Sequence, residues 1–152
     1  MGAHDRLFVK ELWDSSESFT YEGDAVRDKA DVPPNLGHPY GLMRPAEVPE
    51  SQVHMGYCWI TPSDEAATWV HPHVHRDHDE VLIWMGNDPE NPKDLGARLV
   101  MEIDGERHVL TTTGSVFIPR GTVHCPLGWE SVERPFRFIS LFLGPEYEAD
   151  DE

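Results

Sequence analysis

Prolines and glycines are spaced so closely along this sequence that few stretches between them are long enough for a helix. The chain of 152 residues holds 13 prolines and 12 glycines. Both are unfavourable inside helices, proline because it lacks an N–H donor and glycine because ordering its backbone costs entropy. We expect one short helical segment, roughly residues 5–13, where apolar residues recur at helical spacing. The rest of the chain is expected to consist of strands, turns and irregular segments.

From residue 53 onward the sequence consists of short β-type runs separated by turn residues. Asp104-Gly105 separates two of these runs and is a strong hairpin signal. Regularly spaced short strands are typical of an all-β barrel or sandwich. We expect seven strands, at 53–61, 68–75, 80–85, 97–103, 106–112, 115–118 and 135–143. Most of the strand aromatics are expected in the core: Trp59, Trp69, Trp84, Phe117, Phe136, Phe138 and Phe142.

The length of the chain suits one domain. Within it we expect three parts with different composition. Residues 1–52 are expected to form the short helix and an irregular arm, since 22–50 are polar and contain five prolines. Residues 53–144 are expected to form the β-barrel. Residues 145–152 are rich in acidic side chains and are expected to be a solvated tail.

The charge balance excludes several classes of partner. The chain carries 28 acidic and 12 basic side chains, for a formal net charge of −16. Binding to nucleic acid needs a basic surface, and so does docking on an anionic membrane, so we expect neither partner. Two cysteines are too few for a disulfide scaffold. No apolar run resembles a signal peptide or a membrane span, and we expect a cytoplasmic protein.

Histidines are concentrated around position 75. His71, His73 and His75 alternate with other residues, so on a strand their imidazoles would share one face. Glu80 follows five residues after His75, and His124 comes much later, just past a tight turn. Two imidazoles on one face, a carboxylate and a distant imidazole form the kind of donor set that binds a first-row divalent metal ion.

The arrangement of these residues resembles the two sequence motifs of the cupin superfamily. The stretch from His73 to Gly86, with His-x-His, four residues, Glu80 and a later glycine, resembles the first motif. The stretch Pro119-Arg-Gly-Thr-Val-His124 is similar to the second motif, Pro-x-Gly-x-x-His. The resemblance covers roughly residues 53–143. It implies a single jelly-roll type β-barrel with a metal ion bound by His73, His75, Glu80 and His124.

The sequence departs from the family pattern at three positions, none of which supplies a ligand. Ala67 stands where the first motif usually opens with glycine. Gly114 is one residue closer to Pro119 than usual, and Gly128 replaces an asparagine that often closes the second motif. The histidine pair has an alternative register, His71 with His73, which would leave Glu80 too far along the chain for the motif.

The resemblance implies a metal-dependent enzyme that acts on a small oxygenated organic molecule. The donor set suits Fe, Mn, Ni or Zn, and the reaction would be that of a dioxygenase or of an isomerase or lyase. No separate acid–base residue stands out. The alternative is a non-catalytic cupin module that binds a metal or a small ligand. A third interpretation is an interaction protein in which the arm at 22–50 matters more than the barrel. We expect a homodimer, because small cupins tend to pair their barrels and the proline-rich arm could reach across.

Overall fold

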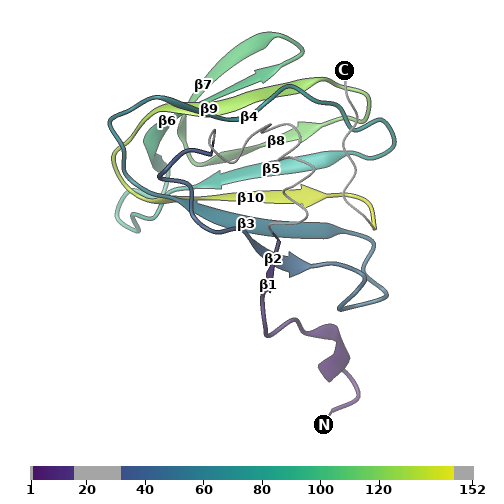
Figure 1. Cartoon of the computed structure of the whole chain (residues 1–152). Coiled ribbons are helices and arrows are strands. Elements are labelled where there is room, and N and C mark those ends of the chain that lie inside the picture. The colour runs from purple at the N-terminus through teal and green to yellow at the C-terminus, as the bar shows by residue number, and fades with distance from the viewer. Residues whose placement is uncertain (1, 16–31, 146–152) are drawn as a thin grey trace.

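The computed structural model describes residues 2–15 and 32–145, and these form two antiparallel sheets that face each other (Figure 1). The six-stranded sheet has the order β1 (Trp13–Asp14), β2 (Tyr40–Met43), β3 (His54–Ile60), β10 (Phe136–Phe142), β5 (Glu80–Met85) and β8 (Gly114–Ile118). The four-stranded sheet has the order β4 (Ala67–Val70), β9 (His124–Val132), β6 (Asp94–Ile103) and β7 (Glu106–Thr112). The expected all-β, jelly-roll type architecture is confirmed, although the two sheets are separate hydrogen-bonded units and not a closed ring.

The core lies between the two sheets and follows the two-residue period of the strands. On β5 the side chains of Leu82 and Trp84 are buried, while those of Val81 and Ile83 are only half-buried. The same alternation on the other strands fills the interior from both sides. The largest fully buried side chains include Trp129, Phe136, Phe142, Leu99 and Met101.

The β6–β7 hairpin confirms the turn that Asp104-Gly105 predicts. Both residues have positive φ, 50° and 79°, as a two-residue hairpin turn requires. Ile103 pairs with Glu106 directly across the turn. The strongest local sequence signal thus fixes the register of this hairpin.

The N-terminal segment differs from the expected helix over 5–13. Its helical part is a single 3-10 turn, Asp5–Leu7, and Trp13 and Asp14 form β1. Leu7, Phe8 and Leu12 are exposed, so the segment has no apolar stripe packed on the core, and short helices without tertiary packing are marginal in water.

The expected arm is also not wholly irregular, because β2 pairs with β3 and so extends the six-stranded sheet. Residues 16–31, which include the first part of the arm, and 146–152 of the acidic tail lie outside the described residues. No helix in the described part of the chain is long and apolar enough to span a membrane.

Gly128 lies where the two sheet strands β4 and β9 approach too closely for a side chain. A β-carbon at this position would lie 2.1 Å from the carbonyl oxygen of Ala67. We expect Gly128→Ala to lower the free energy of unfolding by about 1–3 kcal/mol, as overpacking does, measured by urea denaturation. Gly114→Ala is the matched control, because its β-carbon would come no closer than 3.4 Å to the Trp84 ring. Equal stability of the two variants would contradict the prediction.

Candidate metal centre

Three backbone hydrogen bonds bring the residues of the two motifs together. His73 follows β4, and His124 begins β9. The two residues form an isolated antiparallel bridge in which each N–H donates to the other carbonyl, at 3.0 Å in both directions. The carbonyl of His75 accepts a hydrogen bond from the N–H of Gly121 at 2.7 Å, which ties the first motif to the turn of the second. The resulting backbone framework holds the three histidines in a fixed arrangement.

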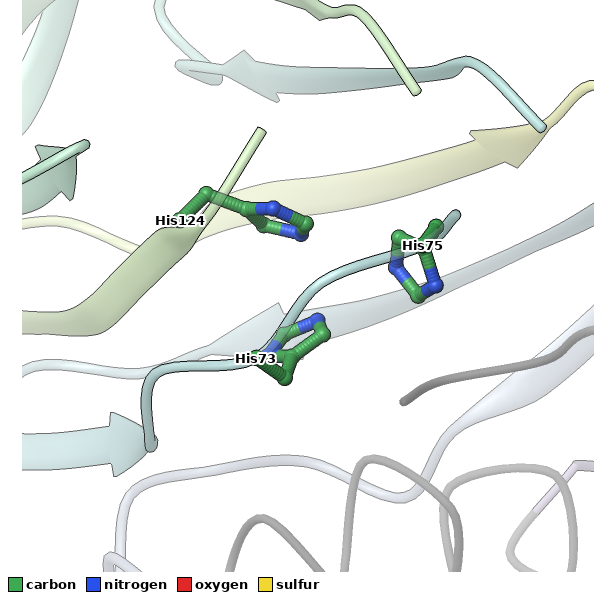
Figure 2. Close-up of side chains that lie close together, drawn as sticks. All are labelled: His73, His75 and His124. Atoms are coloured by element: carbon green, nitrogen blue, oxygen red, sulfur yellow. The ribbon is translucent and has the colours of Figure 1, made fainter. Parts of the chain in front are cut away.

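The side chains of His73, His75 and His124 converge on one point (Figure 2). One ring nitrogen from each lies within 4.8 Å of the others. The ring centroids are 4.3 Å apart for His73 and His124, 4.9 Å for His73 and His75, and 5.1 Å for His75 and His124. Three imidazoles at these distances can share one metal ion.

Glu80 reaches the same cluster from the six-stranded sheet, whereas His124 belongs to the four-stranded sheet. It is the first residue of β5, paired with Ile118 and Phe142 of the neighbouring strands. Its Oε1 lies 3.4 Å from Nε2 of both His75 and His124. All four side chains are at most 4% exposed. The structure therefore brings the carboxylate and the imidazoles of both motifs into one buried cluster.

Hydrogen bonds to backbone carbonyls set the orientation of two of the imidazoles. Nδ1 of His73 lies 2.9 Å from the carbonyl oxygen of His71, and Nδ1 of His124 lies 3.0 Å from that of Thr122. A carbonyl oxygen only accepts, so Nδ1 carries the hydrogen in both rings and Nε2 keeps its lone pair. This is the outer hydrogen bond that metal-ligating histidines ordinarily make.

The inward-facing atoms of the cluster are buried without a hydrogen-bond partner. Among the described residues, none donates a hydrogen bond to Nε2 of His73, Nε2 of His124 or Oε2 of Glu80. The 3.4 Å contact between Nε2 of His124 and Oε1 of Glu80 joins two acceptors and satisfies neither. Buried polar atoms are nearly always satisfied in folded proteins, because leaving one unpaired costs about 1–3 kcal/mol. Imidazole nitrogens and a carboxylate oxygen suit first-row divalent metals, so the residues fit such an ion.

The protonation states also favour metal binding. Burial, and then the neighbouring His124, lower the pKa of His73 to about 4, so this ring is neutral at pH 7. Burial alone would raise the pKa of Glu80, but the adjacent imidazoles of His124 and His75 outweigh it and hold that pKa well below its usual range. A neutral imidazole and an ionised carboxylate are the forms that coordinate metals.

The space beside the cluster inside the fold is small and largely apolar. It amounts to about 10 Å³, room for roughly one water molecule. Trp69, Leu82, Leu127 and Phe138 line it together with the buried thiol of Cys125. The thiol is thus adjacent to the cluster, and Cys125 itself has a positive φ of 74°.

The remaining histidines lie outside the cluster. His71 contributes its carbonyl oxygen to His73 and not its ring, so the alternative His71/His73 pairing is not the one that the structure forms. His78 packs against the ring of Phe142, with centroids 5.2 Å apart. His54 packs against Trp13, and exposed His108 lies 3.0 Å from Glu106.

Comparisons with known proteins agree with the fold. No protein-family model matches the chain, and no curated protein sequence matches it significantly. The structure is similar to KdgF from Halomonas sp., at 19% identity and a TM-score of 0.50, over 78% of this chain and 86% of the other. It is also similar to a predicted oxalate decarboxylase from Thermotoga maritima, at 10% identity and a TM-score of 0.51, over 72% of this chain and 80% of the other.

A longer structure matches over nearly the whole of this chain. Recombinant oxalate oxidase in complex with glycolate has 18% identity and a TM-score of 0.55, over 97% of this chain. The match covers 64% of the oxalate oxidase chain, which is less than two thirds of its length. The two facing sheets and these similarities show that the chain has the fold of the cupin superfamily.

Proposed function

We propose that this protein is a metal-dependent enzyme that acts on a small oxygenated organic molecule at a site formed by His73, His75, His124 and Glu80. One observation carries the proposal: three inward-facing donor atoms of this cluster are buried and have no hydrogen-bond partner among the described residues. A purely structural cluster would pair these atoms with one another or with the backbone. The spacing of the ring nitrogens of His73, His75 and His124 instead suits a shared divalent ion, with Fe, Mn, Ni and Zn as candidates.

Three residues of the cluster have definite tasks in this proposal. His73 and His124 present Nε2 because their Nδ1 atoms are tied to backbone carbonyls. Glu80 supplies the negative charge that partly neutralises a divalent cation, and as a ligand it is not available as the general base. A bound metal of this kind would act as a Lewis acid or, as Fe(II), support reaction with dioxygen. The apolar side chains of Trp69, Leu82 and Phe138 line the inner side of the cluster, where there is room for roughly one water molecule.

The named activities of the similar structures support a small oxygenated substrate. One is an oxalate oxidase with glycolate bound, and another is described as a predicted oxalate decarboxylase. These names fit both branches of the proposal, dioxygen chemistry and metal-led bond cleavage. We propose that this protein is a dioxygenase or an isomerase or lyase.

Metal analysis of the untagged protein, purified without chelator, tests the proposal first. We expect close to one transition-metal ion per chain by plasma mass spectrometry. A His73→Ala, His75→Ala double variant should lose the metal, whereas His108→Ala should keep it, because His108 is exposed on β7. Protein that contains no metal and takes up none on titration would contradict the proposal and favour a non-catalytic binding module.

The identity of the metal directs the activity assay. Iron would lead to oxygen-uptake measurements with catechols, diketones and thiols as substrates. Manganese, nickel or zinc would lead to isomerase and lyase assays. Turnover that needs the metal and is lost in the double variant is the expected result. Turnover that survives complete removal of the metal would contradict the proposed mechanism.

A further inference from the structure

Asp79 and Arg120 form a close contact between the segments of the two motifs. Oδ1 of Asp79 accepts a hydrogen bond from the backbone N–H of Arg120 at 2.8 Å and another from its Nε at 3.2 Å. Oδ2 accepts a third from Nη2 of Arg120 at 3.3 Å. A carboxylate that binds a guanidinium through both of its oxygens is held in one orientation, because the two planar groups match. The bond to the main-chain N–H fixes the backbone of Arg120 as well as its side chain.

Both residues lie close to candidate ligands along the chain. Asp79 directly precedes Glu80, the first residue of β5. Arg120 lies in the turn 119–123, which leads from the end of β8 to His124 at the start of β9. The contact between Asp79 and Arg120 therefore connects the chain beside one ligand to the chain just before another.

The position of this turn matters because it crosses from one sheet to the other. β8 belongs to the six-stranded sheet and β9 to the four-stranded sheet. Glu80 is fixed within the first sheet by its pairing with Ile118 and Phe142, and His124 within the second by its pairing with Ile103. The 3.4 Å distance between Oε1 of Glu80 and Nε2 of His124 is thus a distance between the two sheets, and the pairing within each sheet does not set it.

Two consecutive N–H groups of the turn bind the first motif at either end of a short loop. The N–H of Gly121 donates to the carbonyl of His75 at 2.7 Å, and the N–H of Arg120 donates to the carboxylate of Asp79. The carbonyl of Asp79 in turn accepts from the N–H of Leu143, just past β10, at 3.0 Å. Asp79 is therefore anchored to the six-stranded sheet through its backbone, while its side chain holds the turn. Because this link is made by a side chain, a substitution can remove it.

An exposed ion pair alone would not have such a role. Pairs of that kind contribute about 0–1 kcal/mol to stability. The ion pairs of Glu130 on β9 with Arg98 on β6 and Arg107 on β7 are examples, since all three side chains are at least 40% exposed. The side chain of Asp79 is only 25% exposed, and its carboxylate also binds a backbone N–H group.

We propose that Asp79 is a positioning residue of the metal centre. Its carboxylate holds the turn 119–123 against the start of β5 and so sets the distance between Glu80 and His124, which lie on different sheets. Asp79 acts through the backbone of its neighbours and is not assigned as a ligand. This role rests on the proposed function, because it concerns the geometry of the same site.

Titration of the full-length protein with Co(II), followed by visible absorption, tests the proposal, because the ligand-field bands of bound Co(II) report its coordination geometry. Asp79→Ala should alter these bands and weaken Co(II) binding about 10-fold or more, since loss of a residue that supports a metal ligand costs about 10–100-fold. Asp79→Asn keeps Oδ1 as an acceptor for the N–H of Arg120 and should restore most of the affinity and the wild-type bands. Arg120→Ala keeps the same main-chain bond and should weaken binding by a smaller factor, so the contact is tested even if Asp79→Ala does not fold.

Glu130→Ala is the matched control. It removes a carboxylate that forms two ion pairs within the four-stranded sheet, and it should leave the Co(II) affinity and the bands unchanged. Urea denaturation of the metal-free variants separates positioning from stability. A merely structural role for Asp79 would lower the free energy of unfolding and leave the bands of the loaded protein as they are in the wild type.

The outcomes distinguish a failure of this role from a failure of the proposed function. If the wild-type protein binds Co(II), wild-type affinity and bands in Asp79→Ala or in Arg120→Ala would overturn the positioning role alone. An equal change of the bands in Glu130→Ala would overturn it as well. A wild-type protein that takes up no Co(II) would overturn both the positioning role and the proposed function.

Discussion

His124→Ala is expected to abolish stoichiometric metal binding and any metal-dependent turnover. The side chain offers a buried Nε2 to the cluster and, among the described residues, is the one side chain of the second motif in the candidate ligand group. Even the loss of a residue that merely supports a metal ligand costs about 10–100-fold in affinity, so loss of a ligand should cost on the order of 100-fold or more. Titration with Co(II) or Zn(II), followed by competition with a chelator, measures the change.

The fold should survive this substitution. The bridge between His73 and His124 is made by backbone atoms, which alanine retains. Removing the imidazole also removes a buried polar atom without a hydrogen-bond partner, which offsets part of the lost packing. We therefore expect a β-rich circular dichroism spectrum like that of the wild type. Full metal occupancy in a folded His124→Ala protein would show that this residue is not a ligand.

Much of the candidate site could be predicted because its residues follow local rules. His73 and His75 are two residues apart, so an extended backbone places both side chains on one face, and Glu80 begins the next strand. The contact between Glu80 and the histidines joins the two sheets, and nothing in the local sequence specifies it. The chemistry of the donor set grouped His124 with the others, and the resemblance to the two cupin motifs implied that they share one site.

The strand β9 was not among the expected strands, for a physical reason. Pro126 and Gly128 lie within it, and both residues are normally confined to sheet edges, bulges or close approaches. Here the pairing with β6 is irregular between Met101 and Ile103, close to Pro126. Gly128 is required because the Ala67 carbonyl is so near. The Ala67 and Gly128 departures from the cupin motifs are thus adjacent in space.

The two-residue alternation of side chains along a strand does not by itself show which aromatic residues are buried. Trp69, Trp84, Phe136, Phe138 and Phe142 are buried as expected. Trp59 and Phe117 are exposed, so the expectation that most of the set is in the core is confirmed for five of the seven residues. When both faces of a strand are apolar, the two-residue period shows that side chains alternate but does not show which set faces inward. Trp59 on β3 and Phe117 on β8 proved to lie on the side of the six-stranded sheet that faces away from the core.

Phe136→Ala is expected to cause the largest loss of stability among the substitutions considered. Phe136 begins β10, pairs with Ile60 of β3 and has no exposed surface. Truncating a buried phenylalanine removes its transfer free energy and leaves a cavity, which together cost about 3–5 kcal/mol. Urea denaturation of metal-free protein, with metal excluded so that ligand binding does not add to stability, measures the difference.

Phe8→Ala provides the matched control for this effect. Phe8 is 65% exposed, and its ring contacts the ammonium group of Lys10 at 5.8 Å from the ring centroid. Its truncation should change the free energy of unfolding by about 0.5 kcal/mol or less, as surface substitutions do. The comparison isolates burial, because both variants lose the same ring. A Phe136→Ala protein as stable as Phe8→Ala would show that the space between the two sheets near β10 is not the packed core that the structure describes.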